Sequence, residues 1–307
     1  MQKKTVQLIT SNSLMIGLWA SAFPGIRAGL EGYTPEHLAL FRLLIGSMAL
    51  LLFAVLTQMR LPDLKDIPAI FLLGFLGFAF YHILLNIGEK TVSAGVASLL
   101  VTTTAPIFSA MLSRLFYKEH FGFTKWLGSM ISLLGVLLIA FGAGDFTYSM
   151  NGIMVILLAA FSESIYFVFQ ARYIKKYGFI PFVTFTIWGG TIPMLVFLPG
   201  LGEEMMNASI SATLSIVYLG LLPTVIHYFA LAYVTSLVGA SEATLSLYVT
   251  PALALIISWL WIGEIPTLIS LLGGVVTVGG VCFTYLKVNK MNKIFITHFS
   301  AKRVKKL

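Results

Sequence analysis

The chain has 307 residues, of which 58% are hydrophobic and only 10% are charged, and its net charge is +8. Its mean hydropathy is +0.92. Because about a quarter of the residues of a soluble domain are charged, this composition excludes a soluble globular fold and predicts that most of the surface meets lipid.

The positive charge has a different meaning in a membrane protein than in a soluble one. Lys and Arg residues fall in short loops and in a C-terminal tail, where they set the orientation of the chain, so we expect no nucleic-acid partner. The single cysteine, Cys282, excludes an intramolecular disulfide, and the scattered histidines predict no metal site and no cofactor.

About ten apolar runs follow one another along the chain, each near the ~20 residues that a helix needs to cross a bilayer. They lie near 11–30, 36–57, 67–88, 94–117, 124–142, 151–173, 181–199, 212–234, 239–262 and 267–287. Lipid excludes an open sheet because every backbone polar group must be paired within the segment. We therefore predict an all-α membrane protein of about ten transmembrane helices.

The basic residues of the loops predict the orientation. If the N-terminus is cytoplasmic, the outer loops hold only Arg27 and Lys90. The inner loops then hold the other basic residues between the spans, which are Lys3, Lys4, Arg60, Lys65, Arg114, Lys118, Lys125, Arg172, Lys175 and Lys176. This bias predicts a multi-pass protein of the cell membrane with both termini cytoplasmic. The basic tail, residues 289–307, is expected to bind anionic lipids.

Two similar stretches, residues 101–120 and 246–266, indicate an internal duplication. Each has a proline followed thirteen positions later by a glutamate, and an offset of 145 relates the two copies. The same offset relates further pairs, including His82 and His227, Gly128 and Gly273, and Gly135 and Gly280. Five spans per half is an odd number, so the halves, residues 1–146 and 147–288, should have opposite orientations in the membrane, as in many transporters.

Several motifs resemble those of the EamA-type transporters of the drug/metabolite transporter superfamily. They are W-A-S-A-F-P-G-I-R at Trp19–Arg27, A-x-x-R at Ala39–Arg42, A-G-V-A-S-L-L…P…E…G near 94–128, and the second copy P…E…G-G-V near 251–275. The resemblance extends to about Leu286. It implies a ten-helix secondary transporter of small metabolites, often an exporter of amino acids or related compounds, that does not hydrolyse ATP.

Glu163 is the sharpest candidate for a functional residue. It lies about twelve residues into the sixth span, near mid-bilayer, where acids usually face a cavity and mark a pathway. Tyr166 is three positions later and shares its helix face. We expect Glu163 to contact either the amino group of a substrate or a coupling proton. The alternative is a hydrogen-bonded glutamate that only joins helices.

Arg42 and the two histidines are further pathway candidates. Arg42 can bind a carboxylate through two parallel hydrogen bonds, or it can pair with an acid and fix the outer gate. His82 and His227 are repeat partners inside spans, where they can line the cavity, handle protons or form helix–helix hydrogen bonds.

The two repeated prolines are expected to kink helices and to shape a cavity. Pro106 and Pro251 each remove a backbone donor, and Thr103 and Tyr248 supply hydroxyl groups close by. Trp19 can contribute an aromatic wall to the same pocket, although the alternative for every aromatic residue here is lipid or core packing.

The sequence thus predicts a secondary exporter that works by alternating access, with a small-molecule substrate, membrane lipids around it and a homodimer as one possible assembly. A membrane-embedded enzyme is disfavoured because Glu163 has no paired base and no metal ligands beside it. A passive channel is the remaining alternative, and concentrative transport would exclude it.

Overall fold

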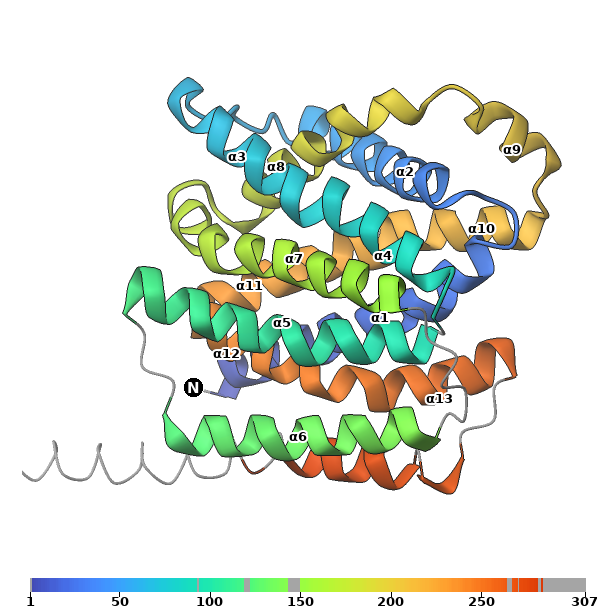
Figure 1. Ribbon diagram of the computed structural model, residues 1–307. Helices are drawn as coiled ribbons and strands as arrows, with labels where there is room; N and C mark the ends of the chain where they lie inside the picture. The colour runs from blue at the N-terminus through green and yellow to red at the C-terminus, as the bar shows by residue number, and fades with distance from the viewer. Residues whose placement is uncertain are drawn as a thin grey trace, which may run out of the picture.

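Every regular secondary-structure element in the described part of the chain is a helix. The computed structural model describes residues 2–92, 94–118, 122–142, 150–263, 267–269, 271–280 and 283. The helices lie side by side with their axes running in a common direction, so the chain crosses the bundle repeatedly from end to end (Figure 1). The predicted tail, residues 289–307, and Cys282 lie outside the described residues.

The helices of the first half follow the predicted apolar runs. They are α1 (Gln2–Gly29), α2 (Pro35–Leu56), the 3-10 turn η1 (Leu64–Asp66), α3 (Ile67–Gly74), the π-helix η2 (Phe75–Phe80), α4 (Tyr81–Glu89), α5 (Ala94–Tyr117) and α6 (Phe123–Gly142). The run from η1 to α4 is one continuous membrane-length segment, Leu64–Glu89.

The second half repeats this order with one added helix in a loop. It contains α7 (Met150–Tyr177), α8 (Phe179–Met194), the 3-10 turn η3 (Leu195–Phe197), α9 (Leu201–Asn207), α10 (Ile210–Leu219), the π-helix η4 (Gly220–Ile226), α11 (His227–Val238), α12 (Ala240–Leu245), the 3-10 turn η5 (Ser246–Val249) and α13 (Thr250–Ile262). A further helix, Leu271–Gly280, follows α13.

Six segments of the described chain are long and apolar enough to cross a membrane. They are Pro35–Leu56, Leu64–Glu89, Ala97–Tyr117, Asn151–Tyr177, Phe179–Phe197 and Ile210–Val238. Shorter apolar helices occupy parts of three other predicted spans, and α1 covers the first one. The prediction of an all-helical membrane protein is confirmed, whereas the number ten stays a prediction.

The two π-helices occupy equivalent places in the two halves. η2 begins at Phe75 and η4 at Gly220, which are 145 positions apart, and each is followed by one of the paired histidines, His82 or His227. In η4 the Thr224 hydroxyl donates to the carbonyl oxygen of Leu219, five residues earlier, at 2.8 Å. Because π-helices are rare and often lie at functional sites, this coincidence marks both histidine regions.

Repeat-related residues contact each other directly at two levels of the bundle. Their numbers differ by 145, and the contacts are Tyr248 hydroxyl to Thr103 carbonyl at 3.3 Å and Ser132 Oγ to Thr277 carbonyl at 3.1 Å. A further contact between the halves joins Ser47 Oγ to Thr191 Oγ1 at 2.7 Å. Contacts between equivalent residues are expected when a twofold axis relates two similar units, because each surface then meets its own copy.

The contact between α6 and the helix Leu271–Gly280, which we call the glycine interface, is related to itself by the same axis. The two helices lie side by side in Figure 1. A methyl group built on Gly135 would meet backbone atoms of Gly273 and Thr277, and one built on Gly280 would meet those of Gly128 and Ser132. The residue numbers rise along one helix as they fall along the other, so the helices are antiparallel.

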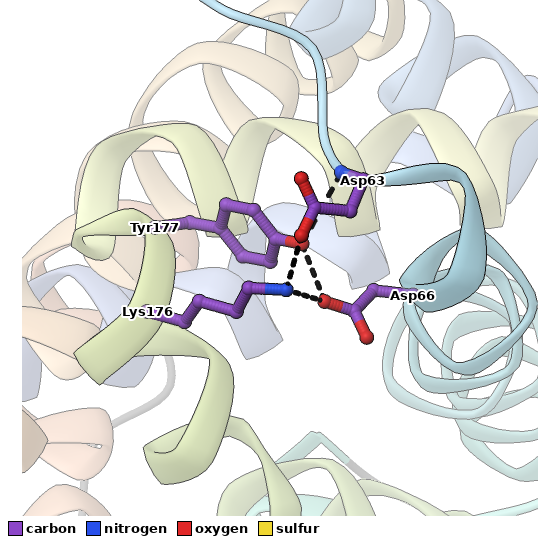
Figure 2. A network of polar contacts seen from close by, with 4 residues as sticks. All are labelled: Asp63, Asp66, Lys176 and Tyr177. Atoms are coloured by element: carbon purple, nitrogen blue, oxygen red, sulfur yellow. Dashed lines mark hydrogen bonds and ion pairs between the residues drawn. The ribbon is translucent and has the colours of Figure 1, made fainter.

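Polar contacts tie the two halves together at both ends of the bundle. At the end where the N-terminus lies, Lys176 contacts Asp63 at 2.6 Å and also contacts Asp66, and the Tyr177 hydroxyl donates to Asp66 (Figures 1 and 2). We call this the Lys176 network. It joins the loop before α3 to the end of α7.

A second set of contacts, the His37 network, lies at the other end, where Figure 1 shows α9. Glu204 of α9 contacts His37 at 2.9 Å and accepts a hydrogen bond from the Thr34 backbone N–H at 2.9 Å. These residues join the loop between α8 and α10 to the start of α2. In each half, the loop that contacts the other half is the one that follows the second helix. These loops follow α2 in the first half and α8 in the second.

Candidate functional site

Glu163 lies in the middle of α7 and is wholly buried. Its Oε1 atom accepts a hydrogen bond of 2.7 Å from the Tyr228 hydroxyl of α11, while its Oε2 atom has no hydrogen-bond partner among the described residues. A carboxylate with half of its acceptors open is costly away from water. The open oxygen therefore marks a position where a ligand, a proton or water can bind.

Three aromatic rings pack against one another next to this carboxyl group, and one of them belongs to Tyr228, its hydrogen-bond partner. Phe78 of η2 lies 4.5 Å from the ring of Tyr228 and 5.3 Å from that of Tyr166, and the two tyrosine rings are 5.8 Å apart. Gly77 permits this packing, because a methyl group on it would lie 2.6 Å from Cγ of Tyr166. The rings exclude water and leave the carboxyl group as the polar centre of an apolar cage.

Arg42 reaches the same region from α2. Its side chain is buried, and its Nε donates to the Thr224 hydroxyl of η4 at 2.6 Å. The guanidinium retains donors beyond Nε. The cluster thus combines a buried guanidinium group from the first half with a buried carboxyl group from the second.

The two histidines flank the cluster with the same hydrogen-bond arrangement. His82 Nδ1 bonds to the Phe78 carbonyl at 2.7 Å, and His227 Nδ1 bonds to the Met15 carbonyl at 2.8 Å. A carbonyl only accepts, so Nδ1 must carry the hydrogen and Nε2 of the neutral ring is an acceptor. Both Nε2 atoms are buried and unpartnered within the described chain.

The aromatic wall is completed by α1. The Trp19 indole lies 5.1 Å from the His227 ring and 5.8 Å from Phe167. Trp19 is 4% exposed and Glu163 is 0% exposed, so the cluster is closed to the surface. It can hold a small ligand only after the helices around it move.

Six of the eight predicted pathway residues converge on this cluster, which we call the Glu163 cluster. They are Glu163, Tyr166, Trp19, Arg42, His82 and His227, contributed by α1, α2, α4, α7 and α11. The other two, Thr103 and Tyr248, contact each other at the twofold axis between α5 and η5, outside this cluster. Whether any of these residues binds substrate stays a prediction.

The two prolines have different local structures. Helix α5 continues through Pro106, as expected for a kink within a helix. Pro251 does not lie mid-helix: the chain passes through the 3-10 turn η5, and Pro251 then occupies the first turn of α13, where its missing N–H costs nothing.

Sequence reasoning missed Glu89 and Thr224. Glu89 ends α4, is 0% exposed and accepts no hydrogen bond on its carboxylate from the described residues. In the sequence, Glu89 stands next to Lys90 and so resembles a charged loop residue. The packing of the helices separates the two side chains, because that of Glu89 is buried and that of Lys90 is exposed. Thr224 follows a proline within an apolar run, and nothing in that run indicates an arginine partner.

Comparisons with known proteins agree with this architecture. The family model of the EamA-like transporters matches twice, at residues 12–141 and 150–286. A solved structure shares the fold with a TM-score of 0.71 at 18% identity, covering 92% of this chain and 98% of that chain.

Two curated relatives extend the comparison. The uncharacterized transporter YdfC of Bacillus subtilis (strain 168) is 96% identical over the full length of both chains. A probable terminal-alkyne amino-acid exporter of Streptantibioticus cattleyicolor is 36% identical over 87% of this chain and 90% of its own. With both halves matched by the family model, the chain belongs to the EamA-like transporter family and is a multi-pass membrane transporter, not an enzyme.

Proposed function

We propose that this transporter exports small metabolites with an amino group, amino acids and related compounds among them, by alternating access. The single observation that carries the proposal is the buried Glu163 carboxyl group, which has one open oxygen and lies between helices of both halves. An ammonium group is the natural partner of such an oxygen, because charge-assisted hydrogen bonds are the strongest that a small ligand offers.

Arg42 supports the second half of the substrate assignment. Its buried guanidinium belongs to the same cluster as Glu163 and retains donors beyond Nε. An amino acid carries both an ammonium and a carboxylate group, so it can contact Glu163 with the first and Arg42 with the second. The name of the relative described above, an amino-acid exporter, is consistent with this substrate class.

The two polar networks supply gates for alternating access. Each joins one half of the chain to the other, and they lie at opposite ends of the bundle. A groove of about 580 Å³ beside the Lys176 network, lined in part by Asp63, Lys176 and Tyr177, offers an approach from that end. We propose that one network opens while the other stays closed, exposing the Glu163 cluster to one side at a time.

The same proposal includes the topology. The contacts between repeat-related residues and the antiparallel glycine interface support two inverted halves, 1–146 and 147–288, with five spans each. Arg60 and Lys65 flank the Lys176 network, so the basic loops favour a cytoplasmic position for this end and for both termini.

The test is transport by purified protein in liposomes. The probe is propargylglycine, a terminal-alkyne amino acid, compared with its analogue that lacks the amino group. We expect the wild-type protein to transport propargylglycine and the Glu163→Gln variant to lose about tenfold or more in apparent affinity, because one charge-assisted contact is removed. The deaminated analogue should not distinguish the two proteins.

The control is Glu31→Gln, which makes the same substitution at an exposed glutamate. It should transport as the wild type does. If Glu163→Gln matches this control with propargylglycine and in pH-driven uptake, Glu163 only packs helices and the assignment is wrong. Dissipative flux without accumulation under any imposed gradient would favour a passive channel instead.

A further inference from the structure

A stripe of buried polar side chains runs along α4 away from the Glu163 cluster. His82, Asn86 and Glu89 are four and three positions apart, so they lie on one face of the helix, and all three are 0% exposed. His82 belongs to the Glu163 cluster. Asn86 and Glu89 continue toward the end of the bundle that carries the His37 network, since the Asn86 amide donates to the Pro35 carbonyl at 2.9 Å.

The open atoms of this stripe are all hydrogen-bond acceptors. His82 Nε2, Asn86 Oδ1 and both carboxylate oxygens of Glu89 have no hydrogen-bond partner among the described residues. The orientation of the Asn86 amide is fixed by chemistry, because its nitrogen faces a carbonyl oxygen and its oxygen must face the other way. Four open acceptors along one buried face need an explanation.

The nearby cations do not close these acceptors. Arg27, at the end of α1, donates to the main-chain carbonyl of Glu89 at 3.0 Å and forms no ion pair with its carboxylate within the described chain. Arg42 directs its Nε to Thr224. Their charges reduce the electrostatic cost of burying Glu89, but they leave its oxygens free to accept from a third group.

We propose that His82, Asn86 and Glu89 form the outer half of the substrate pathway, with Glu89 as a second binding site for the ammonium group. The inference rests on the proposed function, because it assumes that Glu163 is the first site. A substrate released from Glu163 then passes from acceptor to acceptor along α4 and leaves when the His37 network opens. A carboxylate at the exit replaces the interaction that the ammonium group loses on leaving Glu163.

The inference has a test that requires no substrate. Cys282 is the only cysteine, so a Cys282→Ser background permits labelling at a single introduced thiol. The Asn86→Cys variant is treated with membrane-impermeant methanethiosulfonates, one carrying a trimethylammonium group and one a sulfonate. We expect it to react from outside, about tenfold faster with the cationic reagent, because a narrow acidic path concentrates cations.

Two further variants control the labelling. Ile87→Cys is one position away on a face that is only half-buried, and it should not react with these impermeant reagents. Adding Glu89→Gln to Asn86→Cys removes the carboxylate and should abolish most of the preference for the cationic reagent. Adding Glu89→Asp keeps a carboxylate and should retain the preference. Retention would also show that the fold tolerates a substitution at this position. An unreactive Asn86→Cys, or a preference unchanged by Glu89→Gln, overturns the proposal.

Propargylglycine transport separates this inference from the one on which it rests. Glu89→Gln should lower the maximal rate by tenfold or more with little change in affinity, whereas Glu163→Gln should weaken affinity. If Glu163→Gln has its effect and Glu89→Gln matches Glu31→Gln, the second site is wrong and the first stands. If Glu163→Gln has no effect, the proposed function fails. The ratio of the labelling rates of Asn86→Cys with the cationic and anionic reagents then decides whether the stripe is a path for cations.

Discussion

The glycine interface allows a stability prediction with a control next to it in the chain. Gly280→Ala places a methyl carbon 2.6 Å from the Ser132 backbone nitrogen and 2.8 Å from the Gly128 carbonyl oxygen, both inside the 3.0 Å that such carbons essentially never cross. These neighbours are backbone atoms that cannot rotate away, so the two helices must separate. Gly279 has no atom within 4 Å of its methyl position, and Gly279→Ala is therefore free of this overlap.

The expected difference in the free energy of unfolding follows from two opposing terms. Overpacking a close interface costs about 1–3 kcal/mol, and alanine gains about 0.5–1 kcal/mol over glycine within a helix. Gly280→Ala should thus lose about 0–2.5 kcal/mol, while Gly279→Ala should gain about 0.5–1 kcal/mol. Gly135→Ala should match Gly280→Ala because the twofold axis relates the two positions, and its methyl carbon would lie 2.6 Å from the Gly273 carbonyl oxygen.

Unfolding of purified protein in mild detergent, followed by circular dichroism against temperature, measures these changes. The close packing at the glycine interface is refuted if the Gly280→Ala variant proves as stable as the Gly279→Ala variant. Its twofold relation is refuted if Gly135→Ala and Gly280→Ala differ by more than about 1 kcal/mol, roughly the scatter expected between similar sites.

Three further predictions concern the buried cluster and the gates. Tyr228→Phe removes the hydrogen bond to Glu163 and should weaken propargylglycine binding severalfold in equilibrium titrations, with the fold intact by size-exclusion chromatography. Thr224→Val keeps the shape of the side chain but leaves the buried Arg42 Nε unpaired, so it should lower the free energy of unfolding by about 1–3 kcal/mol. Lys176→Met removes both ion pairs of its network and should increase thiosulfonate labelling of a cysteine in the adjoining groove; unchanged labelling would show that this network is no gate.

Features that recur at a fixed spacing were predictable from the sequence, because a duplicated chain repeats its packing. The offset that relates His82 to His227 also relates the two π-helices, and the same offset relates the glycines of the glycine interface. Helix content followed directly from the apolar runs, since lipid permits few other structures.

Contacts between helices far apart in the sequence were not predictable in the same way. The spacing of Glu163 and Tyr166 fixes only their shared face, whereas the hydroxyl that bonds Glu163 comes from Tyr228 on another helix of the cluster. Glu89 was not predicted because two adjacent charged residues, Glu89 and Lys90, are typical of an exposed loop. Its place beside Arg27, in the last turn of α1, depends on how two separate helices pack. Such pairings depend on how each helix is rotated about its own axis. A helix that is apolar on all sides specifies this rotation only weakly.

The matching π-helices carry information about the ancestry of the chain. A π-helix holds more residues per turn than an α-helix, so it commonly originates when one residue is inserted into an existing helix. η2 and η4 begin 145 positions apart, as do the histidines that follow them. Two independent insertions would have had to fall at the same place twice. One insertion, made before the sequence of a single half was duplicated, accounts for both π-helices and for their common place next to the paired histidines.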